Sequence, residues 1–343
     1  MTLDLPARLD LDGGALVANW RALARMAGVP AGAAVKADGY GLGARGVADR
    51  LVAAGCRDLF VATWAEALAL GECGAAVAVL HGVREEDMAA TGLPNARPVL
   101  TTPEQVRRWR DAGGGACDVM VDTGMHRLGV SAEDVAAGLL DGLRIDVLMS
   151  HLACADENSA MNAVQRNALA GLRDRTSARR LSLANSAGIA LGKDYAFDLV
   201  RPGLALYGGV PCAALADIIR PVARPEAQIL QRRRVPAGGA VGYNATWTAP
   251  ADTEVAIVNL GYADGYWRGF SGKGFVRAGE AALPVIGRVS MDLTALDVST
   301  APALAEGDWV TFDYALPKAA AASGMSQYEL LTGLGSRFAR VWR

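Results

Sequence analysis

The sequence predicts an α/β protein with an N-terminal (β/α)8 TIM-like barrel followed by a mostly β C-terminal domain. Short apolar runs that fit buried strands alternate with helix-like segments over about 200 residues, as in a barrel. Polar residues stand where most of these runs stop, and barrel enzymes carry their functional side chains there. After residue 222, alternating β-branched segments broken by Gly and Pro replace the helical pattern. We therefore expect domains at 1–222 and 223–343.

The individual elements follow from local spacing. Leu16, Trp20 and Leu23 recur at helical spacing after Asp12, which predicts a helix over 12–27 with Asp12 as its N-cap. The eight expected barrel strands are 33–36, 58–62, 76–80, 97–101, 116–121, 144–150, 180–184 and 197–200. The expected helices between them include 44–53, 64–72, 102–111, 131–141 and 158–175. The expected strands of the second domain are 225–232, 253–260, 273–277, 283–289, 293–298 and 308–313.

Composition excludes several classes of function. Hydrophobic residues make up 52% of the 343 residues and charged residues 20%, which is typical of a globular protein. A net charge of −2 with both signs interspersed gives no case for binding nucleic acid or an anionic membrane. Residues 1–12 do not resemble a signal peptide, and no apolar run reaches the roughly 18 residues of a membrane span. Five cysteines without C-x-x-C spacing favour free thiols in the cytoplasm, and three scattered histidines predict no metal centre.

Lys36 is the central candidate for chemistry. It ends the apolar strand 33–36, precedes a glycine-rich loop, and is the only lysine before Lys193. Such a lysine is either a buried structural partner or a nucleophilic amine, because burial lowers its pKa and frees its lone pair. An uncharged lysine at the rim of a barrel can form a Schiff base with an aldehyde, and pyridoxal 5'-phosphate is the aldehyde cofactor that uses this chemistry.

This cofactor requires donors for its phosphate, a flat neighbour for its ring and a partner for its pyridine nitrogen. His151 can lie against the ring, with Asn185 as a supporting residue. Arg201 offers no acceptor, so it would leave the pyridine nitrogen unprotonated. The electron sink is then weakened and side reactions are suppressed, which suits a reaction that moves one proton. The phosphate candidates are Tyr40, Ser186, Gly203, the Leu204 N–H and Tyr328.

Seven segments of the chain resemble alanine racemases, which are barrel-type (fold type III) pyridoxal phosphate enzymes. In order, they are AVKADGYGLG, VDTGMHRLGV, SHLACAD, ANSAG, VRPGLALYG, NLGYADGYWRG and GRVSMD. The resemblance implies that Lys36 carries the cofactor and is one of two opposed bases, the other being Tyr262 from the second subunit of a homodimer. It implies that Arg127 binds the substrate carboxylate, helped by the backbone at Met291 of the partner subunit. The implied reaction interconverts L- and D-alanine and supplies D-alanine for peptidoglycan.

The chain also departs from the family pattern. Many relatives have histidine at Leu42, some have a carbamylated lysine at Met120, and many have a histidine at Ser182 that contacts the ring-facing arginine. Composition alone leaves Tyr266 as an alternative to Tyr262, and only the resemblance chooses between them.

Three other functions compete with alanine racemisation. The first is a racemase of broader range that also accepts serine or other small amino acids. The second is a non-catalytic pyridoxal phosphate homeostasis protein, which would be a barrel alone, without GYADGY or SMD. The third is a decarboxylase of similar plan, which would use a cysteine and acidic residues for a diamine and would not need Arg127. The second domain argues against the homeostasis protein, and Arg127 argues against the decarboxylase.

Overall fold

A computed structural model describes residues 4–343, which divide into two compact units. The unit that we call the barrel unit comprises residues 16–39 and 44–220, and the unit that we call the β unit comprises residues 4–15, 40–43 and 221–343. The domain boundary between residues 222 and 223 stays a prediction. The prediction that residues 1–12 do not form a signal peptide covers residues 1–3, which lie outside the described residues.

The barrel unit is built on a sheet of seven parallel strands, counted over residues 4–343, which follow one another in sequence order. They are β2 (Ala33–Ala34), β3 (Asp58–Val61), β4 (Ala76–Val79), β5 (Ala96–Leu100), β6 (Cys117–Met120), β7 (Ile145–Met149) and β8 (Arg180–Ser182). Neighbouring strands of such a sheet need a crossover between them, and helical segments supply most of these crossovers. The TIM-like barrel with a following β domain is thereby confirmed as the fold class.

The eighth expected strand, 197–200, is an irregular segment that still bonds to both edges of the sheet. Phe197 has a φ of 49°, which is incompatible with a regular strand. On one side, the Asp198 N–H donates to the Leu181 carbonyl of β8. On the other, Gly32 donates to the Val200 carbonyl at 2.9 Å. The segment therefore links β8 to the chain just before β2 without forming a strand of its own.

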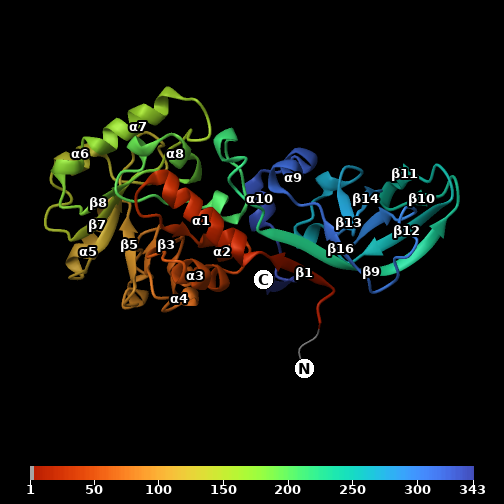
Figure 1. The fold of residues 1–343 in the computed structure, drawn as a ribbon. Helices are drawn as coiled ribbons and strands as arrows, with labels where there is room; N and C mark the ends of the chain where they lie inside the picture. Colours follow the sequence, from red (N-terminus) through yellow and green to blue (C-terminus); the bar gives the residue numbers. More distant parts are fainter. Residues whose placement is uncertain (1–3) are drawn as a thin grey trace. The chain divides into compact units, whose positions relative to one another are not determined.

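Helices accompany the parallel strands (Figure 1). They are α1 (Gly13–Ala27), α2 (Lys36–Tyr40), α3 (Ala44–Ala53), α4 (Trp64–Leu70), α5 (Pro103–Asp111), α6 (Ala132–Ala136), α7 (Ala160–Ala170) and α8 (Ser186–Ala190). Side chains set several starts: the Asp12 carboxylate accepts the Ala15 N–H at 2.7 Å, and Ser131 begins α6 with a capping box. Helix α6 ends before the predicted residue 141 because Gly138, at φ 82°, leaves the helical conformation.

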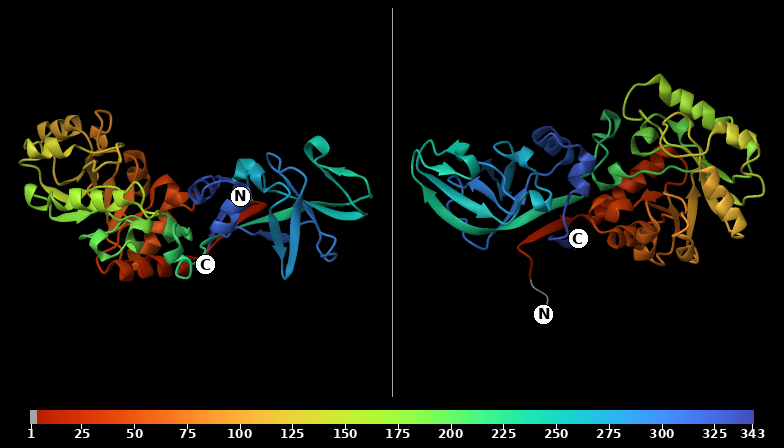
Figure 2. Two further views of the ribbon diagram at one scale, coloured as in Figure 1. Left: turned by 90° about the horizontal axis from the view of Figure 1, so that it is seen from above. Right: turned by 180° about the vertical axis from the view of Figure 1, so that it is seen from behind.

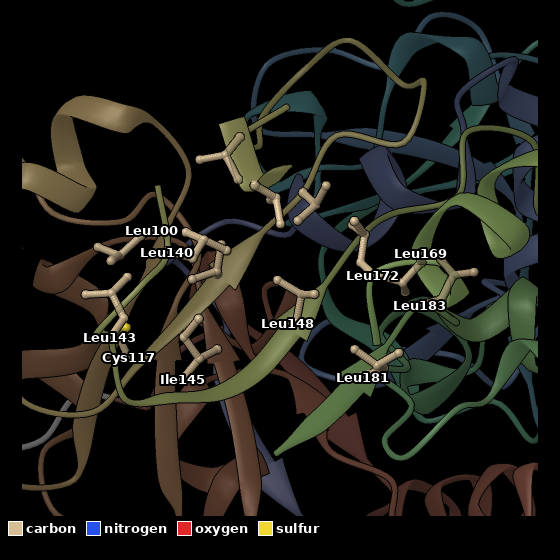
Figure 3. Packing of buried hydrophobic residues seen from close by; sticks show 14 of the residues in the cluster. Leu100, Cys117, Leu140, Leu143, Ile145, Leu148, Leu169, Leu172, Leu181 and Leu183 are labelled. Carbon is tan, nitrogen blue, oxygen red and sulfur yellow. The ribbon is translucent and has the colours of Figure 1, made fainter. Parts of the chain in front are cut away.

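An apolar core fills the space between strands and helices of the barrel unit. Leu148 on β7 and Leu181 on β8 are at most 1% exposed, and Leu169 of α7 is fully buried in the same cluster (Figure 3). Burying one such side chain contributes about 2 kcal/mol. This core holds the strand ends in place, and the candidate site residues follow those ends.

The β unit contains an eight-stranded sheet in the order β12-β15-β14-β13-β16-β9-β1-β17. Strand β12 also pairs with β9, so six of these strands close into a ring. Figure 2 shows β9 as a long curved strand of this sheet. The strands and helices of the unit are β1 (Ala7–Leu11), β9 (Ala223–Val235), β10 (Ala240–Val241), β11 (Trp247–Thr248), β12 (Thr253–Val258), β13 (Phe275–Ala278), β14 (Ala281–Ile286), β15 (Thr294–Asp297), β16 (Trp309–Phe312), β17 (Ala339–Trp342), α9 (Leu316–Ser323) and α10 (Gln327–Thr332).

Four strands of the β unit have no counterpart in the sequence analysis, namely β1, β10, β11 and β17. Strand β1 pairs with β9 in antiparallel fashion and with β17 in parallel fashion, with Arg8 opposite Ala339. These pairings join the two ends of the chain, so local spacing carries no sign of them. Over residues 4–343, no helix is long and apolar enough to cross a membrane.

Candidate active site

Lys36 begins a single turn of left-handed helix, labelled α2, directly after β2. Ala37, Asp38 and Gly39 have φ between 52° and 63° and ψ between 43° and 50°, close to ideal left-handed values. Tyr40 follows with a φ of 54°. This conformation costs about 1–2 kcal/mol for each residue other than glycine, so the surroundings must stabilise it.

The surroundings of Lys36 favour its uncharged form. Burial lowers the pKa of Lys36, and the positive charges of Arg127 and Arg201 lower it further, whereas Glu66 raises it. A lysine whose pKa is lowered keeps a larger fraction of its amine unprotonated at neutral pH. The Lys36 amine can therefore act as a nucleophile or a base.

His151, which follows β7, lies within the same group of charges. Burial lowers the pKa of His151 to about 3, with further lowering by Arg201, Arg127 and Lys36. The imidazole is therefore neutral at neutral pH and presents a flat, uncharged ring. The barrel unit thus brings together four of the predicted site residues.

Arg201 is buried and held by two oxygen acceptors. Its Nη1 donates to the Ser182 hydroxyl and its Nη2 to the Ser150 carbonyl, each at 2.5 Å. The Ser182 hydroxyl in turn donates to the Leu199 carbonyl at 2.5 Å. Burial lowers the pKa of Arg201 to about 10, so it stays charged at neutral pH. Ser182, where the sequence departs from the family pattern, thus contacts Arg201 directly.

A second group of predicted residues surrounds the start of α8. Asn185 is the N-cap of this helix, since its side chain accepts the Gly188 N–H at 2.9 Å. The Ser186 hydroxyl accepts the N–H groups of Gly203 at 3.0 Å and Ala205 at 3.2 Å. The Ser186 hydroxyl and these backbone amides lie close together, and such groups can donate hydrogen bonds to an anion such as a phosphate.

Arg127 lies in a loop after β6 that Asp122 organises. Asp122 Oδ1 accepts the N–H groups of Gly124, Met125 and His126 at 2.8–3.1 Å. Partial burial would raise the pKa of Asp122, but these donors outweigh it and lower the pKa. Arg127 itself is exposed, and within residues 4–343 no hydrogen bond or ion pair holds its guanidinium. The loop therefore presents a cation that is available to an anionic ligand.

Gln165 of α7 is a site residue that the sequence analysis missed. It is fully buried, its Oε1 accepts the Ala153 N–H at 2.9 Å, and its Nε2 donates to the His151 carbonyl at 2.9 Å. It also contacts the Thr123 hydroxyl at 3.3 Å, and that hydroxyl bonds the Ser150 hydroxyl at 2.7 Å. Gln165 therefore ties the ends of β6 and β7 together. A glutamine within a helical pattern gives no sequence signal for this role.

In the β unit, Tyr262 lies on a loop joined to the segment that contains Met291. The Tyr262 N–H donates to the Ser290 carbonyl and the Ala263 N–H to the Met291 carbonyl, both at 3.0 Å. The Arg268 guanidinium lies 5.0 Å from the Tyr262 ring centroid. The structure thus brings together two segments that the sequence analysis had singled out separately.

The neighbouring Tyr266 lies in the core of the β unit. It is 2% exposed, and its ring stacks on Phe270 at 4.3 Å and meets Phe312 edge-on at 4.6 Å. Burial raises the pKa of Tyr266, so it is a poor proton acceptor. Of the two tyrosines, only Tyr262 reaches the surface of the unit.

Tyr40 and Tyr328 form another pair in the β unit. Their ring centroids are 6.3 Å apart, with Tyr40 buried and Tyr328 on α10 exposed. Burial raises the pKa of Tyr40, and Tyr328 raises it further. Leu42, where many relatives have histidine, is fully buried, and Met120 at the end of β6 is 7% exposed.

A parallel barrel that carries a lysine of lowered pKa among arginines, together with a β domain, defines a class of barrel enzymes. Comparison with known proteins identifies the family within this class. The model of the alanine racemase N-terminal domain matches residues 11–211, and the model of the alanine racemase C-terminal domain matches residues 222–342. The chain belongs to the alanine racemase family, a family of isomerases, as its motifs predicted.

Individual relatives agree over nearly the whole length. An alanine racemase of Acidiphilium cryptum is 42% identical over 97% of this chain and 98% of its own length. A catabolic alanine racemase of Agrobacterium fabrum is 42% identical over 97% of this chain and 91% of its own. The crystal structure of Bartonella henselae alanine racemase with covalently bound pyridoxal phosphate has a TM-score of 0.89 and 32% identity, and covers 99% of this chain and 100% of its own.

Proposed function

We propose that this protein is a pyridoxal phosphate-dependent racemase that interconverts L- and D-alanine. The observation that carries the proposal is the lysine of lowered pKa at the end of β2, in a chain whose close relatives bear the name alanine racemase. The D-alanine product would supply peptidoglycan. We further propose a cytoplasmic location, because five unpaired cysteines suit a reducing compartment.

The residues of the barrel unit fit pyridoxal phosphate. Lys36 would bind it covalently, His151 would lie against its ring, and the cation of Arg201 would contact its pyridine nitrogen. The phosphate would be held by the group around Ser186, Gly203 and Leu204, with Asn185 as a support. Tyr40 and Tyr328, which belong to the β unit, stay predicted phosphate ligands. When bound, the cofactor supplies an electron sink that makes the α-proton of alanine removable.

The protein's own residues would then move one proton. Arg127, which has no hydrogen-bonding partner within residues 4–343, would bind the substrate carboxylate as a charge-assisted donor. On one face, the unprotonated Lys36 Nζ would take the α-proton, and the protonated form of the same amine would return one. A second group must act on the opposite face, and Tyr262 Oη is the candidate, because Tyr266 is buried.

We propose that Tyr262 acts in the site of a second copy of this chain, so that the enzyme is a homodimer with shared sites. The β unit offers a surface for a partner around the segment of Tyr262. Met291 is 54% exposed, Leu293 38% and Tyr243 65%, and the last two line a hollow in this surface. Large exposed apolar side chains close together are typical of interaction sites. The Met291 backbone would reach the substrate carboxylate from the same segment.

The first experiment measures racemisation of L-alanine and D-alanine by the purified protein, with L-serine and larger amino acids for comparison. Borohydride reduction followed by peptide mass spectrometry should place the cofactor on Lys36. We expect alanine to be the best substrate. Absence of alanine racemisation, or a label on another residue, would refute the proposal.

A second experiment tests the shared site by mixing two inactive variants, Lys36→Ala and Tyr262→Phe. If Tyr262 serves the partner's site, each mixed dimer contains one site with both native residues. Random mixing should then restore about a quarter of the native activity. If both residues come from one chain, no mixed dimer contains an intact site and the mixture stays inactive.

A further inference from the structure

We propose that Glu66 is a positioning residue for Lys36. Its carboxylate holds the left-handed turn that follows the lysine and places a negative charge within electrostatic reach of the amine. The inference depends on the proposed function only for the catalytic role that the proposed function assigns to Lys36. It concerns a residue of α4 that lies outside all seven family-like segments.

Glu66 joins the start of α4 to the residue next to Lys36. Thr63 is the N-cap of α4 and forms a capping box with Glu66. Glu66 Oε2 accepts the N–H groups of Ala62 at 2.6 Å and Thr63 at 3.4 Å. Its other oxygen, Oε1, accepts the Ala37 N–H at 2.8 Å. One carboxylate therefore caps a helix and binds the backbone immediately after Lys36.

The turn after Lys36 needs such a contact. Ala37 and Asp38 are exposed, so side-chain packing contributes little to holding their left-handed conformation. The contacts that remain are hydrogen bonds. The Asp38 carboxylate accepts the Ala44 N–H at 2.8 Å, which closes the far end of the turn. Glu66 acts at the near end, at the peptide that fixes the direction of the Lys36 backbone.

The charge of Glu66 also opposes the other groups around Lys36. Arg127 from the loop after β6 and Arg201 from the segment after β8 both lower the pKa of Lys36. His151 after β7 faces the same cluster and is neutral at neutral pH. Glu66 is the group that raises the pKa of Lys36. It therefore limits how far burial and the two arginines depress the amine, so that the amine can still bind a proton.

The test compares the full-length, cofactor-free protein with its Glu66→Gln variant. Competitive acetylation of amines across a pH range, resolved by peptide mass spectrometry, yields the pKa of each lysine. Loss of the carboxylate charge should lower the pKa of Lys36 by on the order of 0.5–1 unit. Lys193, Lys273 and Lys318 lie elsewhere in the chain and serve as internal references that should not shift.

Two further variants separate charge from structure. Thr63→Ala breaks the same capping box and should cost about 1 kcal/mol of stability, while leaving the pKa of Lys36 unchanged. Glu66→Asp keeps the charge but shortens the reach to Ala37, so the pKa should stay close to the native one while hydrogen exchange at the Ala37 amide becomes faster. The proposal is overturned if Glu66→Gln leaves the pKa of Lys36 unchanged, or if Thr63→Ala shifts it equally.

This outcome is independent of racemase activity. If borohydride fixes the cofactor on Lys36 and the pKa does not respond to Glu66, the role of Glu66 is refuted and the proposed function stands. If Lys36 takes up no cofactor, the proposed function is refuted, and the acetylation experiment still reports the effect of Glu66 on the amine.

Discussion

Replacing His151 by glutamine should flatten the dependence of stability on pH in the mildly acidic range. The folded protein holds the pKa of His151 at about 3, because burial and the nearby Arg201, Arg127 and Lys36 disfavour a further positive charge. An unfolded chain restores a histidine pKa of about 6.5. Between these two values the unfolded state binds a proton that the folded state does not. The stability due to neutral His151 is therefore complete above pH 6.5 and is lost as the pH falls toward 3.

The size of the effect follows from the same two pKa values. Between pH 7 and pH 5, the binding of a proton to the unfolded state alone removes about 2 kcal/mol from the free energy of unfolding. The variant has no such proton to bind and should lose about 2 kcal/mol less than the native chain. Asp118 acts in the opposite direction, because burial raises its pKa to about 6, but it is present in both proteins. The difference between the two proteins therefore isolates His151.

Hydrogen exchange of the β6 and β7 amides, corrected for intrinsic rates, reports the free energy of opening of the barrel unit itself. The cofactor-free native protein should lose roughly thirtyfold more protection than His151→Gln between pH 7 and pH 5. Equal losses of protection in the two proteins would show that His151 is not held neutral by its surroundings, and the electrostatic reasoning would be wrong.

Two more predictions concern the β unit. Tyr262→Phe should reduce racemisation in both directions by about 10²–10⁴-fold while the protein still binds pyridoxal phosphate, as measured by rate assays and by the visible absorption of the bound cofactor; unchanged rates in both directions would contradict the two-base scheme. Gly41→Ala should lower stability by at least about 2 kcal/mol in thermal unfolding, because the added Cβ would lie 2.4 Å from the Leu331 carbonyl oxygen at a φ of 83°. Gly113→Ala is the matched control, since its φ is also positive but the space around it is open, and equal losses would show that the close contact is unimportant.

Secondary structure was predicted wrongly from the sequence at a few elements whose conformation local spacing does not determine. The expected strand at 197–200 has the apolar composition of a strand, yet Phe197 adopts a positive φ, and the segment only bridges β8 and the chain before β2. Helix α6 is shorter than its pattern predicted because a glycine in the left-handed conformation ends it. Thr102 begins α5 by accepting the Gln105 N–H, but the Gln105 side chain accepts the Thr101 N–H instead of completing a capping box.

Features that depend on neighbours in sequence were determined by the sequence alone. These include the alternation of strands and helices, the lysine at the end of the first barrel strand, and the motifs that indicated the family. Only the tertiary structure decided that Glu66 binds the Ala37 N–H, that Ser182 contacts Arg201, and that Tyr266 is buried while Tyr262 is not. The physical reason is that hydrogen bonds, burial and pKa values depend on groups from separate strand ends and helices. Their distances are set by the packing of the whole unit, and no local pattern records them.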